Sequence, residues 1–238
     1  MPYLTSSQTE WLKWLALITM VLDHIGAAFS ANYPALGLFR VIGRFSYLTF
    51  GFIIALNLSR DHIDFSKYFC WMLITALLSE SVFKAFNPEY GRLNTLFQFF
   101  SVIGVVWVYQ VRHIFHYGLQ GIFYAIFFFI SYHADYSLFG LLYCLACYLF
   151  FQVKTRQDRL VAMSCCILLG SLMNYQFLNS RLGYLVVLSL IVTFYYLFSP
   201  SGIRRSTPGV ERMKKVVFYA FYPIHLLMIV TIKFIFIG

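Results

Sequence analysis

Residues 121–130 read Gly121-Ile122-Phe123-Tyr124-Ala125-Ile126-Phe127-Phe128-Phe129-Ile130, a run without a single charge. A strand of an outer-membrane barrel would alternate apolar and polar residues, and this run does not alternate. In hydrocarbon a backbone must satisfy its own hydrogen bonds, so a long apolar run of this kind predicts a helix. The run therefore indicates a helical membrane protein rather than a barrel.

The rest of the 238-residue chain has the same character, because 61% of it is hydrophobic and only 11% is charged. Soluble domains have about 45–50% apolar and about 25% charged residues, so an ordinary soluble globule, a disordered chain and a collagen-like chain are excluded. We predict an all-α, polytopic transmembrane helix bundle of about nine spans, with residues 1–238 forming one integral-membrane domain. The predicted spans are 11–31, 36–58, 67–86, 94–111, 118–133, 137–153, 160–177, 181–198 and 216–237.

The basic residues predict the direction of these spans. If the N-terminus is cytoplasmic, the 18 Lys and Arg residues divide into twelve on the inner side, three on the outer side and three within spans. This is a strong positive-inside bias. The net charge of +9 is then explained by topology and by contact with anionic membrane lipid, so it does not indicate a nucleic-acid partner. The inner set is Lys13, Arg60, Lys67, Arg112, Lys154, Arg156, Arg159, Arg204, Arg205, Arg212, Lys214 and Lys215, and the outer set is Lys84, Arg92 and Arg181.

Ionisable and strongly polar residues within or beside the spans are the main functional signal. Each ionisable group costs about 2.5–3.5 kcal/mol at the middle of a membrane, so each is a candidate for function. The candidates are Asp23 and His24 in the first span, Arg40 and Arg44 in the second, Glu80 in the third, Asn94 at the start of the fourth, Asp135 at the turn between the fifth and sixth, and His225 in the ninth.

Their depths predict that most of these groups share one layer. With a rise of about 1.5 Å per residue and a core of about 30 Å, Asp23, His24 and Arg44 lie roughly 10–12 Å from the outer edge. Arg40 is one turn from Arg44 and shares its helix face, because positions four apart are neighbours. Glu80 has a comparable depth, and His225 lies near the midplane.

Two interpretations of this layer remain open. One is a buried ion pair between Asp23 and Arg44 that only joins the first two helices. Such a pair is weak evidence of stabilisation and needs further partners. The other is a reactive site, because histidine moves protons near neutral pH and a base beside fixed cations is typical of acyl or proton transfer.

No metal site is predicted. His113 and His116 lie three apart at a helix end without acidic partners. Cys144 and Cys147 form a C-x-x-C pattern inside an apolar segment, whereas a zinc site would need a second ligand pair. Buried free cysteine behaves as a small apolar residue, so packing is the expected role of the cysteines.

Several segments together resemble a known family. They are Leu12-Lys13, Met20-Val21-Leu22-Asp23-His24, Gly43-Arg44-Phe45, Ala55-Leu56-Asn57-Leu58-Ser59-Arg60, Asn94-Thr95-Leu96-Phe97, Asp135-Tyr136, Gly140-Leu141-Leu142, Phe218-Tyr219 and Tyr222-Pro223-Ile224-His225-Leu226. In this order and spacing the chain resembles the TraX family of conjugation systems over nearly its whole length.

The resemblance implies a multi-pass protein of the bacterial inner (cytoplasmic) membrane that acetylates the N-terminal amine of pilin, with acetyl-CoA as donor and no metal. It also implies kinship with multi-span acyltransferases, whose acceptor is pilin or another extracytoplasmic amine or hydroxyl. The catalytic positions of the family correspond to Asp23, His24, Arg44 and His225. One departure is Leu48, where relatives often have proline after the Gly-Arg pair.

For such an enzyme we expect His24 to act as the general base, with Asp23 either orienting it or pairing with Arg44 while His24 faces the cavity. Alternatively, His24 or His225 carries the acetyl group as a nucleophile, or His225 only caps polar backbone near Pro223. Asn94 and Asp135 are expected either to support the reactive residues through hydrogen bonds or to fix loops.

The arginines are expected to bind the donor. Arg40 and Arg44 can stabilise the thioester oxyanion or hold an acidic group of the cofactor or acceptor. Arg204 and Arg205, in the basic loop 199–215, can bind a phosphate of the cofactor.

Two alternatives come from other classes of protein. A proton-coupled transporter also uses intramembrane Asp, Glu and His, but transporters commonly have repeated halves, and the sequence has no such symmetry. A non-catalytic assembly protein of a pilus or secretion machine would not need Asp23-His24 at the same depth as Arg44.

Overall fold

The computed structural model describes residues 4–88, 91–178, 182–198 and 211–237. Within these ranges the chain is helical, and its β structure is limited to an isolated bridge between Leu93 and Ala134. The all-α prediction is confirmed.

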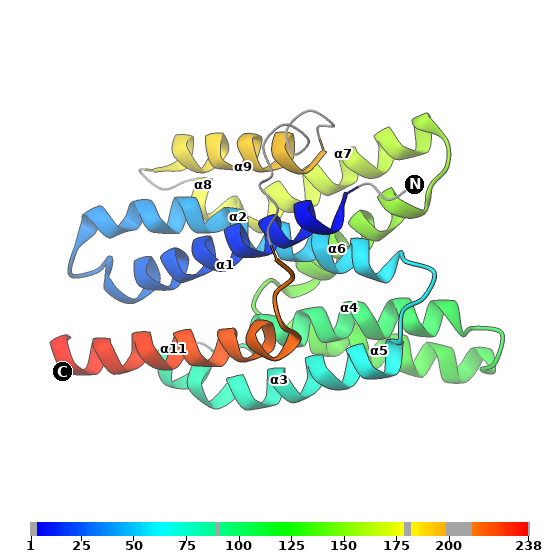
Figure 1. The fold of residues 1–238 in the computed structure, drawn as a ribbon, viewed down its shortest axis with the longest axis horizontal. Helices are drawn as coiled ribbons and strands as arrows, with labels where there is room; N and C mark the ends of the chain where they lie inside the picture. The colour runs from blue at the N-terminus through cyan, green and yellow to red at the C-terminus, as the bar shows by residue number, and fades with distance from the viewer. Residues whose placement is uncertain (1–3, 89–90, 179–181, 199–210, 238) are drawn as a thin grey trace. The chain divides into compact units, whose positions relative to one another are not determined.

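The helices follow the predicted apolar segments closely. They are α1 (Ser6–Phe29), η1 (Pro34–Leu36), α2 (Gly37–Leu58), α3 (Phe65–Phe86), α4 (Thr95–Gln110), α5 (Tyr117–His133), α6 (Ser137–Gln152), α7 (Arg156–Met173), α8 (Tyr175–Leu178), α9 (Gly183–Phe198) and α11 (Lys215–Ile237) (Figure 1). The predicted segment 160–177 is interrupted, because α7 ends before Asn174 and α8 begins after it. The Asn174 amide donates to the Ser171 carbonyl at 3.0 Å, and its Nδ2 donates to the Gly170 carbonyl at 2.8 Å, which tightens the last turn of α7.

Several of these helices are suited to a membrane. In the described residues, Ser6–Phe29, Pro34–Leu58, Phe65–Phe86 and Lys215–Phe236 are long and apolar enough to cross one. The apolar helices α4, α6 and α9 have 16 residues each. At about 1.5 Å per residue such a helix is roughly 24 Å long, less than the core of about 30 Å. The chain therefore has helices that can cross a membrane, as expected of a membrane protein, while nine spans and a cytoplasmic N-terminus are not confirmed and stay predictions.

The helix starts depend on short polar side chains. Thr5 and Gln8 form a capping box at α1, in which the Gln8 amide donates to Thr5 Oγ1 and the Thr5 amide donates to Gln8 Oε1. Asp64 accepts from the Lys67 amide at the start of α3, and Asn94 accepts from the Leu96 amide at the start of α4. Each cap satisfies an amide that has no partner within the helix.

The chain divides into two compact units. Unit 1 comprises Met1–Ile53 and Gly170–Gly238, and unit 2 comprises Ile54–Leu169. The prediction of a single integral-membrane domain stays a prediction.

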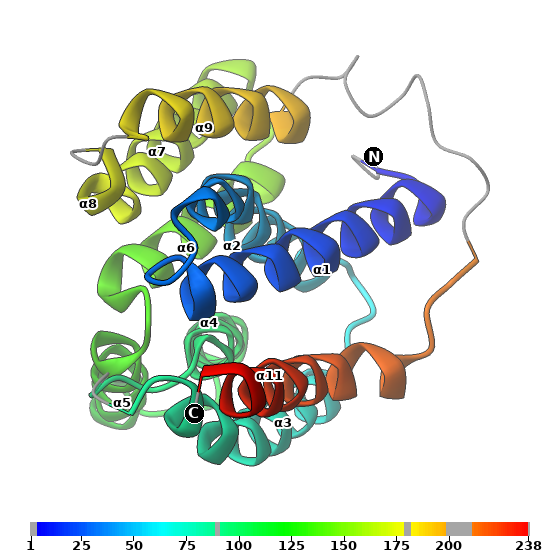
Figure 2. The same ribbon diagram turned by 90° about the vertical axis from the view of Figure 1, so that its left-hand side faces the viewer.

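In unit 1, α1 and α2 lie side by side and are joined at one end through η1 (Figure 2). Their close approach depends on glycine, because a Cβ on Gly43 would overlap the Asp23 side chain and a Cβ on Gly26 would lie 3.0 Å from Arg40 Cγ. Ser189 Oγ of α9 donates to the Val41 carbonyl of α2 at 3.0 Å. The α11 helix packs on α1.

Unit 2 packs α3, α4, α5 and α6 through aromatic side chains and small residues. The Phe69 ring lies 4.3 Å from the Phe100 ring and 6.0 Å from the Phe127 ring, between centroids. A Cβ on Gly104 of α4 would overlap the Phe127 ring of α5. Because lipid is as apolar as these side chains, close packing rather than expulsion of water holds such helices together in a membrane.

Candidate functional site

Asp23 lies at the centre of a charged group between α1 and α2. Its Oδ2 accepts from Arg40 Nη1 at 2.8 Å, and its Oδ1 accepts from Arg44 Nη2. Arg40 Nη1 also lies 3.4 Å from the Asp23 carbonyl, which belongs to the peptide group that leads to His24. Both carboxylate oxygens therefore bind arginine, as in the alternative where Asp23 pairs with Arg44 and His24 faces elsewhere.

Arg44 is enclosed by protein. Its side chain is 3% exposed, its Nε donates to the Arg40 carbonyl at 2.9 Å, and its Cζ lies 4.3 Å from the centre of the Phe177 ring. A guanidinium bound in this way on two edges and one face has a fixed position. Arg44 thus holds Asp23 and α2 together.

Arg40 differs from Arg44 in exposure. Its side chain is 28% exposed, and its Cζ lies 5.3 Å from the Phe177 ring. Asp23 accepts from its Nη1, whereas its Nε and Nη2 have no hydrogen-bond partner among the residues that the structure describes. Two guanidinium cations share one carboxylate, so this group has a net charge of +1 and a partly open donor edge.

His24 and His225 form a hydrogen-bonded pair between α1 and α11. His24 Nδ1 lies 2.9 Å from His225 Nε2, and His225 Nδ1 lies 2.8 Å from the Phe221 carbonyl. A carbonyl oxygen only accepts, so His225 Nδ1 carries a proton and, in the neutral ring, its Nε2 is the acceptor. His24 Nδ1 then donates, which assigns the unprotonated nitrogen of His24 to Nε2. We name Asp23, His24, Arg40, Arg44 and His225 the arginine–histidine cluster.

Aromatic rings of α11 surround the histidine pair. The Tyr222 ring lies 6.1 Å from the His24 ring and 5.6 Å from the His225 ring, and the Phe221 ring stacks on His225 at 5.3 Å. His225 is 6% exposed. Hydrogen bonds and charges act more strongly in such a water-poor environment than in water.

Glu80 and Asn94 belong to unit 2, where they bind each other. Glu80 Oε2 accepts from the Asn94 backbone amide at 3.0 Å and from Asn94 Nδ2 at 2.8 Å. Asn94 Nδ2 also donates to the Ala76 carbonyl at 2.8 Å, while its Oδ1 caps α4. Glu80 Oε1 lies 3.6 Å from Lys84 Nζ. These contacts join α3 to the start of α4.

Asp135, in the turn between α5 and α6, also binds a residue at the start of α4. Its Oδ2 accepts from Thr95 Oγ1 at 3.0 Å, and the Leu93 amide donates to the His133 carbonyl at 2.8 Å. The turn between α5 and α6 is thereby held against the start of α4. We name Glu80, Asn94, Thr95 and Asp135 the Asn94 cluster. Its geometry agrees with the interpretation that Asn94 and Asp135 fix loops, whereas a role of Glu80 beside His24 stays a prediction.

The sequence did not single out Phe177 or Tyr222 as site residues. Phe177 has no distinguishing signal among 27 Phe residues, whereas Tyr222 belongs to the Tyr222-Pro223-Ile224-His225-Leu226 segment of the family resemblance. The polar Asn174 within an apolar segment was the available sign of a helix break near Phe177. Three predicted basic positions, Arg181, Arg204 and Arg205, lie outside the described residues.

The described residues also include histidines and cysteines outside the arginine–histidine cluster. No group of three or more His, Cys, Asp or Glu residues in the described part of the chain is arranged to hold a metal ion. The Sγ atoms of Cys147 in α6 and Cys166 in α7 are 3.6 Å apart, and both residues are buried. Their surroundings agree with a packing role.

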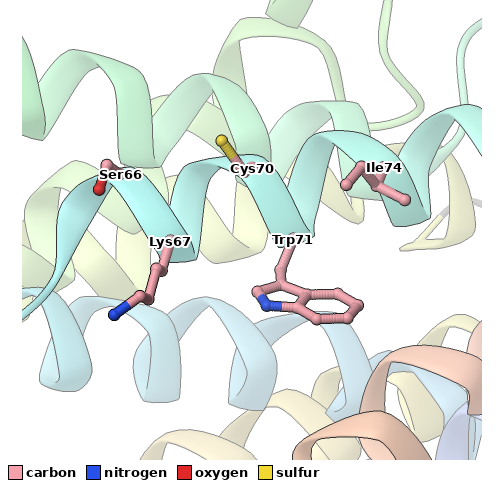
Figure 3. A pocket seen from close by; sticks show the side chains of 5 residues that line it. All are labelled: Ser66, Lys67, Cys70, Trp71 and Ile74. Atoms are coloured by element: carbon pink, nitrogen blue, oxygen red, sulfur yellow. The ribbon is translucent and has the colours of Figure 1, made fainter.

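An open groove on α3 is lined by Ser66, Lys67, Cys70, Trp71 and Ile74 (Figure 3). All five side chains come from one helix, and Lys67 and Trp71 project to the same side of it. The Lys67 ammonium lies 2.9 Å from the Asp64 carboxylate. The groove contains none of the predicted site residues.

Comparison with known proteins shows the family of the chain. A family model described as TraX protein matches residues 8–233, and the chain therefore belongs to the TraX family. The resemblance inferred from the sequence is confirmed. No curated protein and no solved structure matches the chain.

Proposed function

We propose that this TraX-family chain is a membrane-embedded acetyltransferase that transfers the acetyl group of acetyl-CoA to an amine. The observation that carries the proposal is the His24–His225 hydrogen bond, which makes Nε2 the unprotonated nitrogen of His24. A second support is the group with net charge +1 beside it, which includes the residue adjacent to His24.

The reaction follows from these groups. The acceptor nitrogen attacks the thioester carbonyl carbon and forms the new C–N bond, while His24 Nε2 removes the amine proton. The carbonyl oxygen becomes an oxyanion, and the partly open edge of Arg40 is a suitable donor for that charge. The C–S bond then breaks and the thiolate of CoA leaves. His24 Nε2 gives its proton to this thiolate and is neutral again. The products are an amide and CoA.

His225 and Asp23 support these two groups. His225 accepts from His24 Nδ1 and so fixes the tautomer of His24, in the way that a base is commonly oriented by a further group. It can also receive the Nδ1 proton when His24 Nε2 takes one. Asp23 binds both arginines and leaves the charge of the group at +1 rather than +2.

The remaining elements of the proposal are the membrane, the donor side and the acceptor. We propose nine spans in the bacterial inner membrane with a cytoplasmic N-terminus, supported by helices at all nine predicted segments and by the twelve-to-three division of basic residues predicted from the sequence. Acetyl-CoA would then enter from the cytoplasm, and its acetyl-bearing arm would reach His24, about 20 Å from the inner edge by helix rise. The acceptor on the outer side is the N-terminal amine of pilin, in line with a role in pilus maturation.

The transfer can be direct or can pass through an acetyl-enzyme. In the second case His24 Nε2 would attack the thioester itself, and the same nitrogen would carry the acetyl group. Mixing the protein with labelled acetyl-CoA in the absence of acceptor separates the two, because only the second route leaves label on the protein.

The proposal is tested with purified protein in detergent, labelled acetyl-CoA and a peptide that carries the N-terminus of pilin. We expect release of CoA thiol together with labelled peptide, and much less of both with a peptide whose N-terminus is already blocked. Folded protein that consumes no thioester would overturn the proposal. A transporter would move a solute without consuming thioester, and an assembly protein would do neither.

A further inference from the structure

The single-turn helix α8 brings an aromatic ring onto both arginines of the arginine–histidine cluster. The Phe177 ring centre lies 4.3 Å from Arg44 Cζ and 5.3 Å from Arg40 Cζ. One ring therefore contacts both guanidinium groups that share the Asp23 carboxylate.

Close contacts near the end of α7 and hydrogen bonds of Asn174 fix the position of α8. A Cβ on Gly170, near the end of α7, would lie 2.6 Å from Phe194 of α9 and 3.0 Å from Leu48 of α2. Asn174 is 2% exposed and binds the Gly170 carbonyl through Nδ2, while its own carbonyl accepts from the Phe177 amide at 3.0 Å. The interruption of the seventh apolar segment is thus the feature that directs Phe177 to the arginines.

Arg40 needs such a support more than Arg44 does. Asp23 binds Arg40 through Nη1 alone, so the guanidinium can turn about that contact. Arg44 is fixed through Nε and Nη2. A ring face attracts a cation within about 6 Å of its centre, and the attraction is strongest where water is excluded. Contact with Phe177 therefore restricts the plane of the Arg40 guanidinium.

We propose that Phe177 is a positioning residue that fixes the Arg40 guanidinium so that its open Nε and Nη2 edge faces the oxyanion formed at the thioester carbonyl. This inference rests on the proposed acetyltransferase function. It predicts an effect on the chemical step rather than on binding of the donor, because the oxyanion exists only during reaction.

The kinetic test compares Phe177→Leu, which removes the ring but keeps an apolar side chain, with Phe177→Tyr, which keeps the ring. We expect Phe177→Leu to lower kcat by about 10- to 30-fold with a KM for acetyl-CoA within about twofold, and Phe177→Tyr to restore most of the activity. Tyr175→Leu changes an exposed residue of the same turn and should leave kcat unchanged. Equal loss in the Leu and Tyr variants, or no loss in either, would overturn the inference.

A double variant tests whether Phe177 acts through Arg40. In an Arg40→Met background, Phe177→Leu should lower kcat by less than about twofold, because the group that it positions is gone. An undiminished effect in that background would contradict the positioning role.

A spectroscopic measurement separates this inference from the proposed function. In protein labelled at arginine, the Arg40 Nε–H signal, assigned with Arg40→Lys, should shift in Phe177→Leu because the ring current is lost, and should stay nearly unchanged in Tyr175→Leu. An unchanged signal in Phe177→Leu would overturn the positioning role even if wild-type protein consumes no acetyl-CoA. Inactive wild-type protein with the expected shift would overturn the proposed function alone.

Discussion

The arginine–histidine cluster of unit 1 and the Asn94 cluster of unit 2 both contain buried polar side chains, but they differ in charge and in the groups that their hydrogen bonds hold. In the Asn94 cluster the side chains bind backbone groups: Asn94 caps α4 and donates to the Ala76 carbonyl, and Glu80 accepts from a backbone amide. In the arginine–histidine cluster Asp23 binds two arginines and His24 binds His225, and the further bonds of Arg40, Arg44 and His225 go to backbone carbonyls rather than to amides at a helix start.

This difference separates a structural role from a chemical one. A polar group that satisfies backbone at a helix start contributes to holding the fold. The arginine–histidine cluster has a surplus positive charge, a partly exposed donor edge on Arg40 and an unprotonated imidazole nitrogen on His24. Burial of ionisable groups in apolar helices is costly in both places, but the Asn94 cluster holds a helix start and a turn, whereas the arginine–histidine cluster combines a net positive charge with a pair of imidazoles.

The largest expected loss of stability in this comparison comes from Arg44→Met. It leaves the Asp23 carboxylate buried with Arg40 alone, and breaking a buried pair costs about 3–5 kcal/mol. The unfolding midpoint in detergent, followed by tryptophan fluorescence, should fall strongly. Lys67→Met removes an exposed ion pair with Asp64 and should leave the midpoint nearly unchanged. A small shift for Arg44→Met would mean that the cluster does not join α1 to α2.

Asn94→Ala should also destabilise the protein, by about 2–4 kcal/mol, because it removes the cap of α4 and leaves buried partners of Asn94 unsatisfied. Activity then distinguishes the two clusters, because Asn94→Ala should retain the wild-type rate of acetyl transfer per folded molecule. Denaturant unfolding and transfer rate are measured on the same preparation. Loss of transfer in protein that is fully folded would show that the Asn94 cluster takes part in the reaction.

The sequence predicted the members of the arginine–histidine cluster because intramembrane charges are rare enough to be conspicuous. The spacing of Arg40 and Arg44 predicted a shared helix face, and both bind Asp23. Depth along a helix, however, does not determine which helices are neighbours. For that reason Glu80 was grouped with His24 by depth, while its contacts in unit 2 are with Asn94 and Lys84.

Other features depended on tertiary contacts that a single sequence does not encode locally. Phe177 is one phenylalanine among 27, and its role follows from a helix break at Asn174 that lies within an apolar run. The tautomer of His24 depends on the Phe221 carbonyl, two hydrogen bonds away. The helices themselves were predictable because apolar length is a local property of the chain.

A smaller effect is expected from Gly43→Ala, which should destabilise the protein by about 1–3 kcal/mol through overpacking. The added Cβ would lie 2.6 Å from Asp23 Cγ and would push the carboxylate away from the arginines. The matched control is Gly121→Ala in α5, where a Cβ meets nothing within 4 Å. It should stabilise by up to about 1 kcal/mol through helix propensity. Shifts of the same sign in both unfolding midpoints would contradict the close approach of α1 and α2.

The smallest effect is expected from Thr95→Val, which keeps the shape of the side chain but removes its hydrogen bond to Asp135. The loss of one such bond costs about 0.5–1.5 kcal/mol. Amide hydrogen exchange at the turn between α5 and α6 should accelerate, with acetyl transfer unchanged. An unchanged exchange rate would contradict the claim that the Thr95–Asp135 hydrogen bond holds the turn between α5 and α6.

The most direct test of the central claim is the rate of acetyl transfer in His24→Ala beside Asn94→Ala, with the exposed His62→Ala as control. Removal of a general base lowers a rate by about 10²- to 10⁴-fold, so His24→Ala should lose transfer by that factor while it remains folded. Asn94→Ala and His62→Ala should transfer at nearly the wild-type rate per folded molecule. Full transfer by His24→Ala would contradict the assignment of the reactive site to the arginine–histidine cluster.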